Sequence, residues 1–84
     1  MYSVIIGNPA QGFIKKLDKS KQKRVLNKIS ELEENPQLGK KLKGKLSGLR
    51  NLRIDEFRII YTIKDIELIV LVVKVGERSK IYKI

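Results

Sequence analysis

The chain opens with a short apolar segment that gives way to helical spacing. Tyr2 to Ile6 is rich in β-prone residues and ends at Gly7-Asn8-Pro9. Asn8 is a residue type that caps helices, and proline is favoured at the first helical position. We therefore predict a strand that leads directly into a helix, with Asn8 as the cap.

Apolar residues then recur every three or four positions, which is the spacing of one face of a helix. We predict a first helix with a stripe at Phe13, Ile14 and Leu17. A second helix, capped by Ser20, follows and ends at Asn35-Pro36, with a stripe at Val25, Leu26, Ile29 and Leu32. The two together predict a helical hairpin.

Beyond residue 50 the period changes to two, which indicates strands. Leu52 and Ile54 alternate with Asn51 and Arg53, and Asp55-Glu56 is the turn. The next strand has Phe57, Ile59, Tyr61 and Ile63 on one face and Arg58, Ile60 and Thr62 on the other, and it turns through Lys64-Asp65.

A third strand is predicted from about Glu67 to Val75, where Gly76 interrupts it. Its near-continuous apolar character favours an interior position in the sheet. The stretch from Pro36 to Ser47 reads as a basic connector with some helical tendency. The predicted fold is α+β: a strand, a two-helix hairpin and a three-stranded antiparallel meander, with the helices on one face of a curled sheet. Residues 1–84 form one domain.

Composition narrows the possible functions. The 84 residues carry 19 Lys and Arg against 9 Asp and Glu, a net charge of +10. Such a surplus favours a polyanionic partner. The longest apolar run, Leu68 to Val73, is far shorter than the ~20 residues that span a bilayer, and the start lacks the features of a signal peptide. We expect a cytoplasmic protein with no membrane association.

Several classes of chemistry are absent from the sequence. There is no cysteine and no histidine, which removes thiolate nucleophiles and the usual zinc and haem ligands. No phosphate-binding glycine loop, dinucleotide motif or carboxylate cluster is present. We expect no metal and no cofactor.

Strand alternation gives the candidate site. Arg53 and Arg58 fall on the face opposite Leu52 and Phe57, so adjacent strands bring two guanidinium groups together, and Arg78 extends the cluster. Guanidinium groups match the oxygens of a phosphate. Tyr82 is a candidate general acid or base. Two simpler interpretations stay open: the arginines only solubilise the surface, and Tyr82 packs along the sheet edge.

The connector and the residue after it add further positive charge. This density suits non-specific contact with a nucleic-acid backbone, although lysine-rich connectors are more often solvated loops. The candidate RNA-binding residues are Lys40, Lys41, Lys43, Lys45 and Arg50.

Several segments resemble the RelE/ParE superfamily of bacterial and archaeal toxins, specifically the RelE branch. The resemblance spans nearly the whole chain. It rests on Asn8-Pro9-Ala10 with Phe13, Lys16 and Leu17; Asn35-Pro36; Leu42-Lys43-Gly44; Leu52-Arg53-Ile54; Phe57-Arg58-Ile59-Ile60-Tyr61; Val75-Gly76-Glu77-Arg78; and Ile81-Tyr82.

The resemblance implies a toxin of a type II toxin–antitoxin system. It would be an mRNA interferase, an endoribonuclease that enters the ribosomal A site, cuts the messenger by metal-independent attack of the ribose 2′-hydroxyl and so inhibits translation. Arg53, Arg58 and Arg78 would match the family's phosphate-binding cations, and Tyr82 its C-terminal tyrosine. The RelE pattern usually places two basic residues on alternate positions of the first meander strand. Here Asn51 takes the first, and Arg50 points the other way.

The resemblance also implies partners: the ribosome with its mRNA, and a RelB-like acidic antitoxin in a higher complex such as a heterotetramer. Two alternatives remain. A ParE-type relative would inhibit DNA gyrase without cutting RNA, and a non-enzymatic basic module would bind RNA through its lysines alone.

Overall fold

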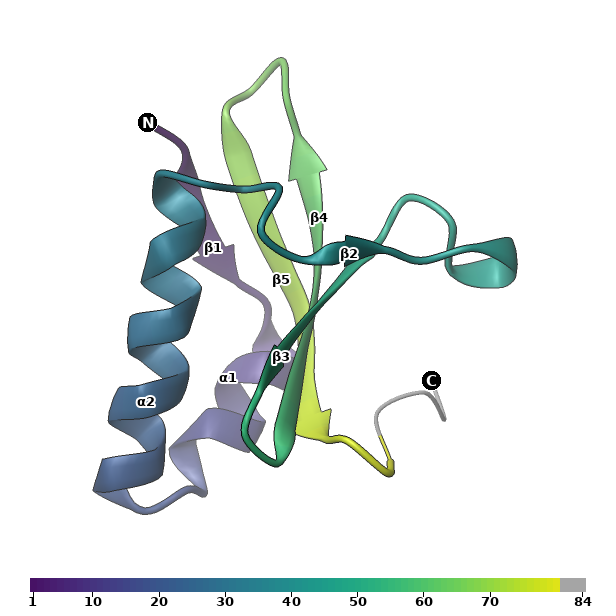
Figure 1. The fold of residues 1–84 in the computed structure, drawn as a ribbon. Coiled ribbons are helices and arrows are strands. Elements are labelled where there is room, and N and C mark those ends of the chain that lie inside the picture. Colours follow the sequence, from purple (N-terminus) through teal and green to yellow (C-terminus); the bar gives the residue numbers. More distant parts are fainter. Residues whose placement is uncertain (81–84) are drawn as a thin grey trace.

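The computed structural model describes residues 1–80. Two helices lie on one face of a mixed sheet of five strands, in the order β1-β5-β4-β3-β2 (Figure 1). The strands are β1 (Ser3–Ile6), β2 (Lys40–Lys41), β3 (Arg50–Ile54), β4 (Phe57–Lys64) and β5 (Ile69–Glu77). The helices are α1 (Asn8–Lys15) and α2 (Lys19–Ser30), with 3-10 turns at η1 (Glu31–Glu33) and η2 (Gly44–Leu46).

The predicted fold class is confirmed. β3, β4 and β5 form the antiparallel meander, and β1 pairs in parallel with β5, which makes β5 an interior strand as predicted. The expected alternation also holds, since Leu52, Phe57, Ile59 and Tyr61 face the helices and are buried. They pack against Ala10, Ile14, Val25, Ile29 and Leu32 from the helical layer. Phe13 and Phe57 meet edge to face, with ring centroids 5.8 Å apart.

Several predicted element ends are wrong. Asn8 is the first residue of α1, and Gly7 occupies the cap position. The cap of α2 is Asp18 rather than Ser20: its carboxylate accepts a hydrogen bond of 2.9 Å from the Lys21 backbone N–H. This bond holds the pKa of Asp18 below its usual value. Propensity alone does not choose between neighbouring capping residues, because the tertiary turn decides where the helix begins.

The basic connector fits the prediction only in part, since its helical tendency is limited to η2 and the strand β2 was not predicted. It contains the short strand β2 and the turn η2, not a helix, and Figure 1 shows this arm extending away from the helical layer. The bond from the Leu42 N–H to the Leu49 carbonyl, 2.9 Å, closes its base. Thr62 Oγ1 donates to the Gly48 carbonyl at 2.8 Å and fixes the arm to β4.

Gly76 does not interrupt the third strand, because β5 runs through it to Glu77. Instead the irregularity is a bulge: Ile60 pairs with Lys74, but the next residue, Tyr61, pairs with Val72, so Val73 is an extra residue in β5. The bulge resets the alternation and turns Lys74 onto the face away from the helices.

Candidate functional site

The β3–β4 hairpin places two arginines on the sheet face opposite the helices, called the open face below. Arg53 and Arg58 are direct cross-strand partners, as the alternation predicted. They flank the two-residue turn Asp55-Glu56, where Asp55 adopts a left-handed conformation with φ 50°. Like charges placed directly opposite destabilise a sheet. A carboxylate neighbour or a bound anion between the two guanidinium groups would offset this repulsion.

Arg78 is brought to the same turn by the backbone. Its N–H donates to the Glu56 carbonyl at 2.9 Å, directly after β5 ends. Arg78 thus begins at the turn that Arg53 and Arg58 flank, and it lines one depression together with Arg58. Within residues 1–80, no carboxylate lies within 4.0 Å of the Arg53 or Arg78 guanidinium. Glu77, next to Arg78, pairs with Lys80 at 3.7 Å instead.

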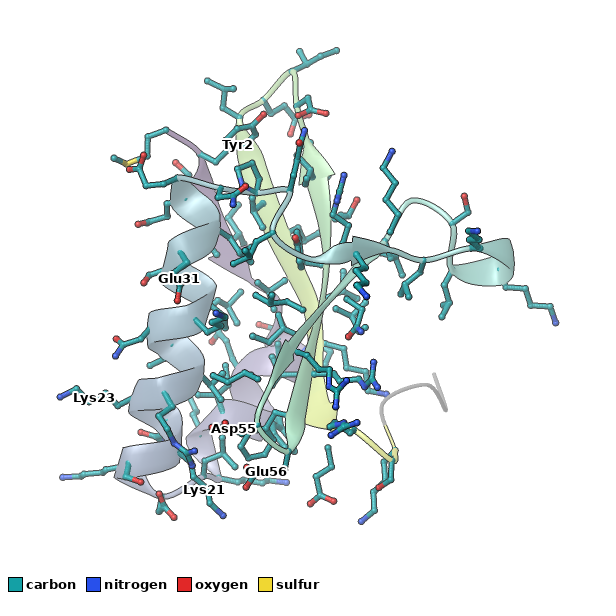
Figure 2. All side chains as sticks on the ribbon, viewed as in Figure 1. Tyr2, Lys21, Lys23, Glu31, Asp55 and Glu56 are labelled. Carbon is teal, nitrogen blue, oxygen red and sulfur yellow. The ribbon has the colours of Figure 1, made fainter. Side chains whose placement is uncertain are left out.

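Two residues in the N-terminal half of α2 form ion pairs with the same turn. Arg24 forms a close ion pair with Asp55, and the Lys21 ammonium lies 3.7 Å from the Glu56 carboxylate. Figure 2 shows Asp55 and Glu56 near the end of α2 that carries Lys21. These contacts, called the turn clasp below, hold the acidic residues of the turn toward the helices, while the flanking arginines lie on the open face.

Two shallow depressions meet at Arg58. The larger, about 690 Å³, is lined by Glu56, Arg58, Glu77, Arg78 and Ser79. The second, about 300 Å³ and called the β3 cleft below, is lined by Lys28, Leu38, Lys40, Asn51, Leu52, Arg53 and Arg58. Arg58 is therefore the shared wall of a surface that extends from β2 to the end of β5. A surface of this length suits a chain of phosphates better than a single ion.

A row of residues across the open face was not predicted. The register places Lys40, Asn51, Ile60 and Lys74 side by side on β2, β3, β4 and β5. Ile60 is fully buried there, although it lies outside the helix-facing core. A polar residue in the otherwise apolar run of β5 was the available signal for Lys74, but its direction depended on the bulge at Val73.

The five predicted RNA-binding residues do not share one surface. Lys40 lines the β3 cleft, and Lys43 and Lys45 lie exposed in the arm. Lys41 and Arg50 line a separate cleft of about 420 Å³ between the arm and the β4–β5 turn. Arg50 also supports the fold, because Nη1 donates to the carbonyls of Gly39 at 2.8 Å and Gln37 at 3.4 Å.

The start of the arm is anchored by Tyr61. Its buried hydroxyl accepts from the Gly39 N–H at 2.8 Å and donates to the Pro36 carbonyl at 2.7 Å. Burial raises the pKa of Tyr61, against smaller lowering contributions from the Gly39 N–H and the Arg50 charge. Tyr61 and Phe57 are both buried, so neither offers a ring for stacking on a base.

Tyr82, the remaining predicted site residue, lies outside the described residues, so its role stays a prediction. No helix within residues 1–80 is long and apolar enough to cross a membrane.

Sequence comparison identifies the family. Residues 4–82 match the family model for the ParE toxin of type II toxin–antitoxin systems. The chain is 36% identical over 76 residues to a protein of Escherichia coli named as RelE-like toxin, covering 82% of this chain and 77% of that protein. It is 30% identical to a Methanocaldococcus jannaschii protein named as toxin RelE4, covering 99% and 93%.

Structural comparison gives the same fold. The chain is similar to the toxin–antitoxin complex RelBE2 of Mycobacterium tuberculosis, with a TM-score of 0.85, 26% identity, and coverage of 92% of this chain and 98% of the matched chain. The fold also matches the isolated RelE toxin of E. coli, with a TM-score of 0.78 at 24% identity over 99% and 93% of the two chains. On these grounds the chain belongs to the RelE/ParE superfamily of type II toxin–antitoxin toxins, as its sequence motifs predicted.

Proposed function

We propose that this toxin is a ribosome-dependent endoribonuclease that cuts mRNA in the ribosomal A site. The observation that supports this best is the convergence of Arg53, Arg58 and Arg78 at one turn on the open face. The +10 net charge of the chain favours approach to the ribosome, which is polyanionic. Because ribosomes are cytoplasmic, we expect this protein to act in the cytoplasm.

The chemistry needs cations that bind the phosphate, a proton acceptor and a proton donor. The ribose 2′-hydroxyl gives its proton to a base, a protein side chain or water, while its oxygen bonds to the adjacent phosphorus and the bond from phosphorus to the 5′-oxygen breaks. The departing 5′-oxygen takes up a proton from an acidic side chain or from water. Guanidinium groups that hold the non-bridging oxygens stabilise the extra negative charge of the transition state and align attacking and leaving oxygens. Tyr82 remains the candidate for proton transfer.

Primer extension on mRNA in ribosomes with an empty A site tests this proposal. Wild type should give a new stop that is absent without ribosomes. Arg78→Ala should lower the cleavage rate by about 100-fold or more, the effect typical of removing one donor to a developing oxyanion. Lys23→Ala, an exposed change on α2 that leaves the net charge the same as in Arg78→Ala, should cut at the wild-type rate.

Absence of any stop with folded wild type would exclude the nuclease function. Equal losses in Arg78→Ala and Lys23→Ala would show that only total charge matters, and the arginine cluster would then have no specific role.

A second candidate follows from the matching family model, whose description names the ParE toxin. A ParE-type toxin would inhibit DNA gyrase. Loss of supercoiling by purified gyrase in the presence of this protein, with mRNA left intact, would favour that function. Intact supercoiling together with the ribosome-dependent stop favours the nuclease.

We also propose that an acidic, RelB-like antitoxin binds this chain. Relatives with this fold occur in toxin–antitoxin complexes, including the RelBE2 complex of M. tuberculosis and a heterotetrameric YoeB–YefM complex of Staphylococcus aureus. Such a partner would cover exposed apolar surface along β1 and the β4–β5 turn. This surface consists of Met1, Ile5, Ile66 and Leu68. Co-expression with a neighbouring acidic open reading frame, followed by size-exclusion chromatography, should yield one complex, with a heterotetramer expected.

A further inference from the structure

The Asn51 carboxamide has an unmet hydrogen-bonding requirement inside the β3 cleft. Its Oδ1 atom is buried, and within the described residues no donor bonds to it. A buried acceptor without a partner loses its interaction with water and gains nothing in return. Such atoms are uncommon in folded proteins and call for an explanation, and a ligand that brings a donor is one.

The surroundings of Asn51 define that ligand. Lys40 is its direct partner on β2, and Arg53 lies two residues along β3 on the same face. Arg58, opposite Arg53, completes the cationic wall of the cleft. A phosphodiester satisfies these cations but has no donor for the carboxamide oxygen. The matching ligand therefore carries an anionic group with a hydroxyl or N–H close beside it.

RNA meets this description at every nucleotide. The ribose 2′-hydroxyl is on the carbon next to the one that carries the 3′-phosphate, and DNA lacks this donor. We propose that Asn51 accepts a hydrogen bond from a ribose 2′-hydroxyl while Lys40 and Arg53 bind the neighbouring phosphates. Asn51 is then the residue with which this site distinguishes RNA from DNA. The inference rests on the proposed function, because it assigns RNA to the same surface.

The cleft allows this contact to form. Lys40 and Arg53 are exposed, long side chains, and Asn51 is half-buried beside them. For a ligand to reach the buried carboxamide oxygen a flexible side chain of the cleft has to move, and the exposed Lys40 and Arg53 are the long side chains on either side of Asn51. A protein segment could also supply acids and N–H donors, but its acidic groups lie at variable distances from its donors, whereas RNA repeats anion and donor at one short spacing.

Fluorescence anisotropy with the free, full-length protein tests the assignment. Two labelled single-stranded probes of one sequence are compared at low salt: RNA, and 2′-fluoro RNA, which keeps the sugar pucker but removes the donor. Wild type should bind RNA about 3–10-fold more tightly, the range that one net hydrogen bond gives. Asn51→Leu should bring this ratio to about one while leaving the 2′-fluoro affinity unchanged.

Two further variants separate the contact from general effects. Asn51→Asp keeps an acceptor and should keep the preference for RNA, although its negative charge weakens binding of both probes. Asn27→Leu, the same exchange on the exposed side of α2, should match wild type in both affinities.

A wild-type ratio of one, or a preference that survives in Asn51→Leu, would overturn the inference. So would a loss of affinity in Asn51→Leu for a glutamate-rich peptide instead of RNA, which would assign the group to a protein partner. The primer-extension assay keeps the two proposals apart: cleavage by wild type with a ratio of one refutes only the role of Asn51, whereas an RNA preference without cleavage refutes only the nuclease function.

Discussion

At the scale of single residues, Tyr61 shows how one hydroxyl can organise a loop. It holds the Gly39 N–H and the Pro36 carbonyl at the point where the chain leaves the helices and starts the arm. Glycine is required at position 39 because there is no room for a side chain, and not because of its φ angle. A Cβ at this position would lie 2.8 Å from the Tyr61 hydroxyl and 2.9 Å from the Asn51 carbonyl.

Tyr61→Phe should therefore destabilise the protein by about 1–3 kcal/mol, because it leaves a buried N–H and a partly buried carbonyl without this partner. Urea unfolding measures this free energy. Tyr2→Phe removes a hydroxyl that bonds to the exposed Asp65 carboxylate, and it should cost much less. Equal losses in the two variants would show that the buried network has no special weight.

The raised pKa of Tyr61 predicts a loss of stability in alkali. The unfolded chain releases the phenol proton near pH 10, whereas the folded protein keeps it to higher pH, so stability is complete below pH 10 and falls above it. Tyr2, whose pKa is raised by its hydrogen bond to Asp65, acts in the same direction. Unfolding followed from pH 8 to 11 should show a shallower decline in Tyr61→Phe, and an unchanged slope would contradict the assignment.

At the scale of elements, the turn clasp connects α2 to the hairpin that carries the arginines. Its members are about half exposed, so each pair should contribute less than about 1 kcal/mol to stability. A double-mutant cycle of Arg24→Ala and Asp55→Ala should give a small coupling energy that decreases in 0.5–1 M salt. A large, salt-independent coupling would mean that the pair is effectively buried.

At the scale of the whole molecule, the net positive charge of +10 includes the lysines of the arm, the segment with β2 and η2 that extends away from the helical layer (Figure 1). If its lysines contact phosphates, Lys43→Ala should weaken RNA binding equally for different sequences. It should also reduce the slope of log Kd against log salt by about 0.7, the value for one phosphate contact on a single strand. Titrations between 50 and 200 mM salt measure this slope. Lys23→Ala on the helical layer is the matched control, and an identical slope change there would show that the arm is not the contact.

The sequence by itself determined the fold class, the helix-facing core and the pairing of Arg53 with Arg58. Each follows from local periodicity, because the period of two fixes the face of every residue in a regular strand. The family also followed from motifs within short segments. The ends of helices were less predictable, since Asn8, Asp18 and Ser20 are all capable caps and the packing of the chain selects among them.

Only the tertiary structure decided which distant residues share a surface. The bulge at Val73 turned Lys74 to the open face, and the pairing of β2 with β3 placed Lys40 beside Asn51. Local periodicity fixes neither placement. Both depend on hydrogen bonds between different strands. The register of those strands is set by which of their residues must be buried against the helices.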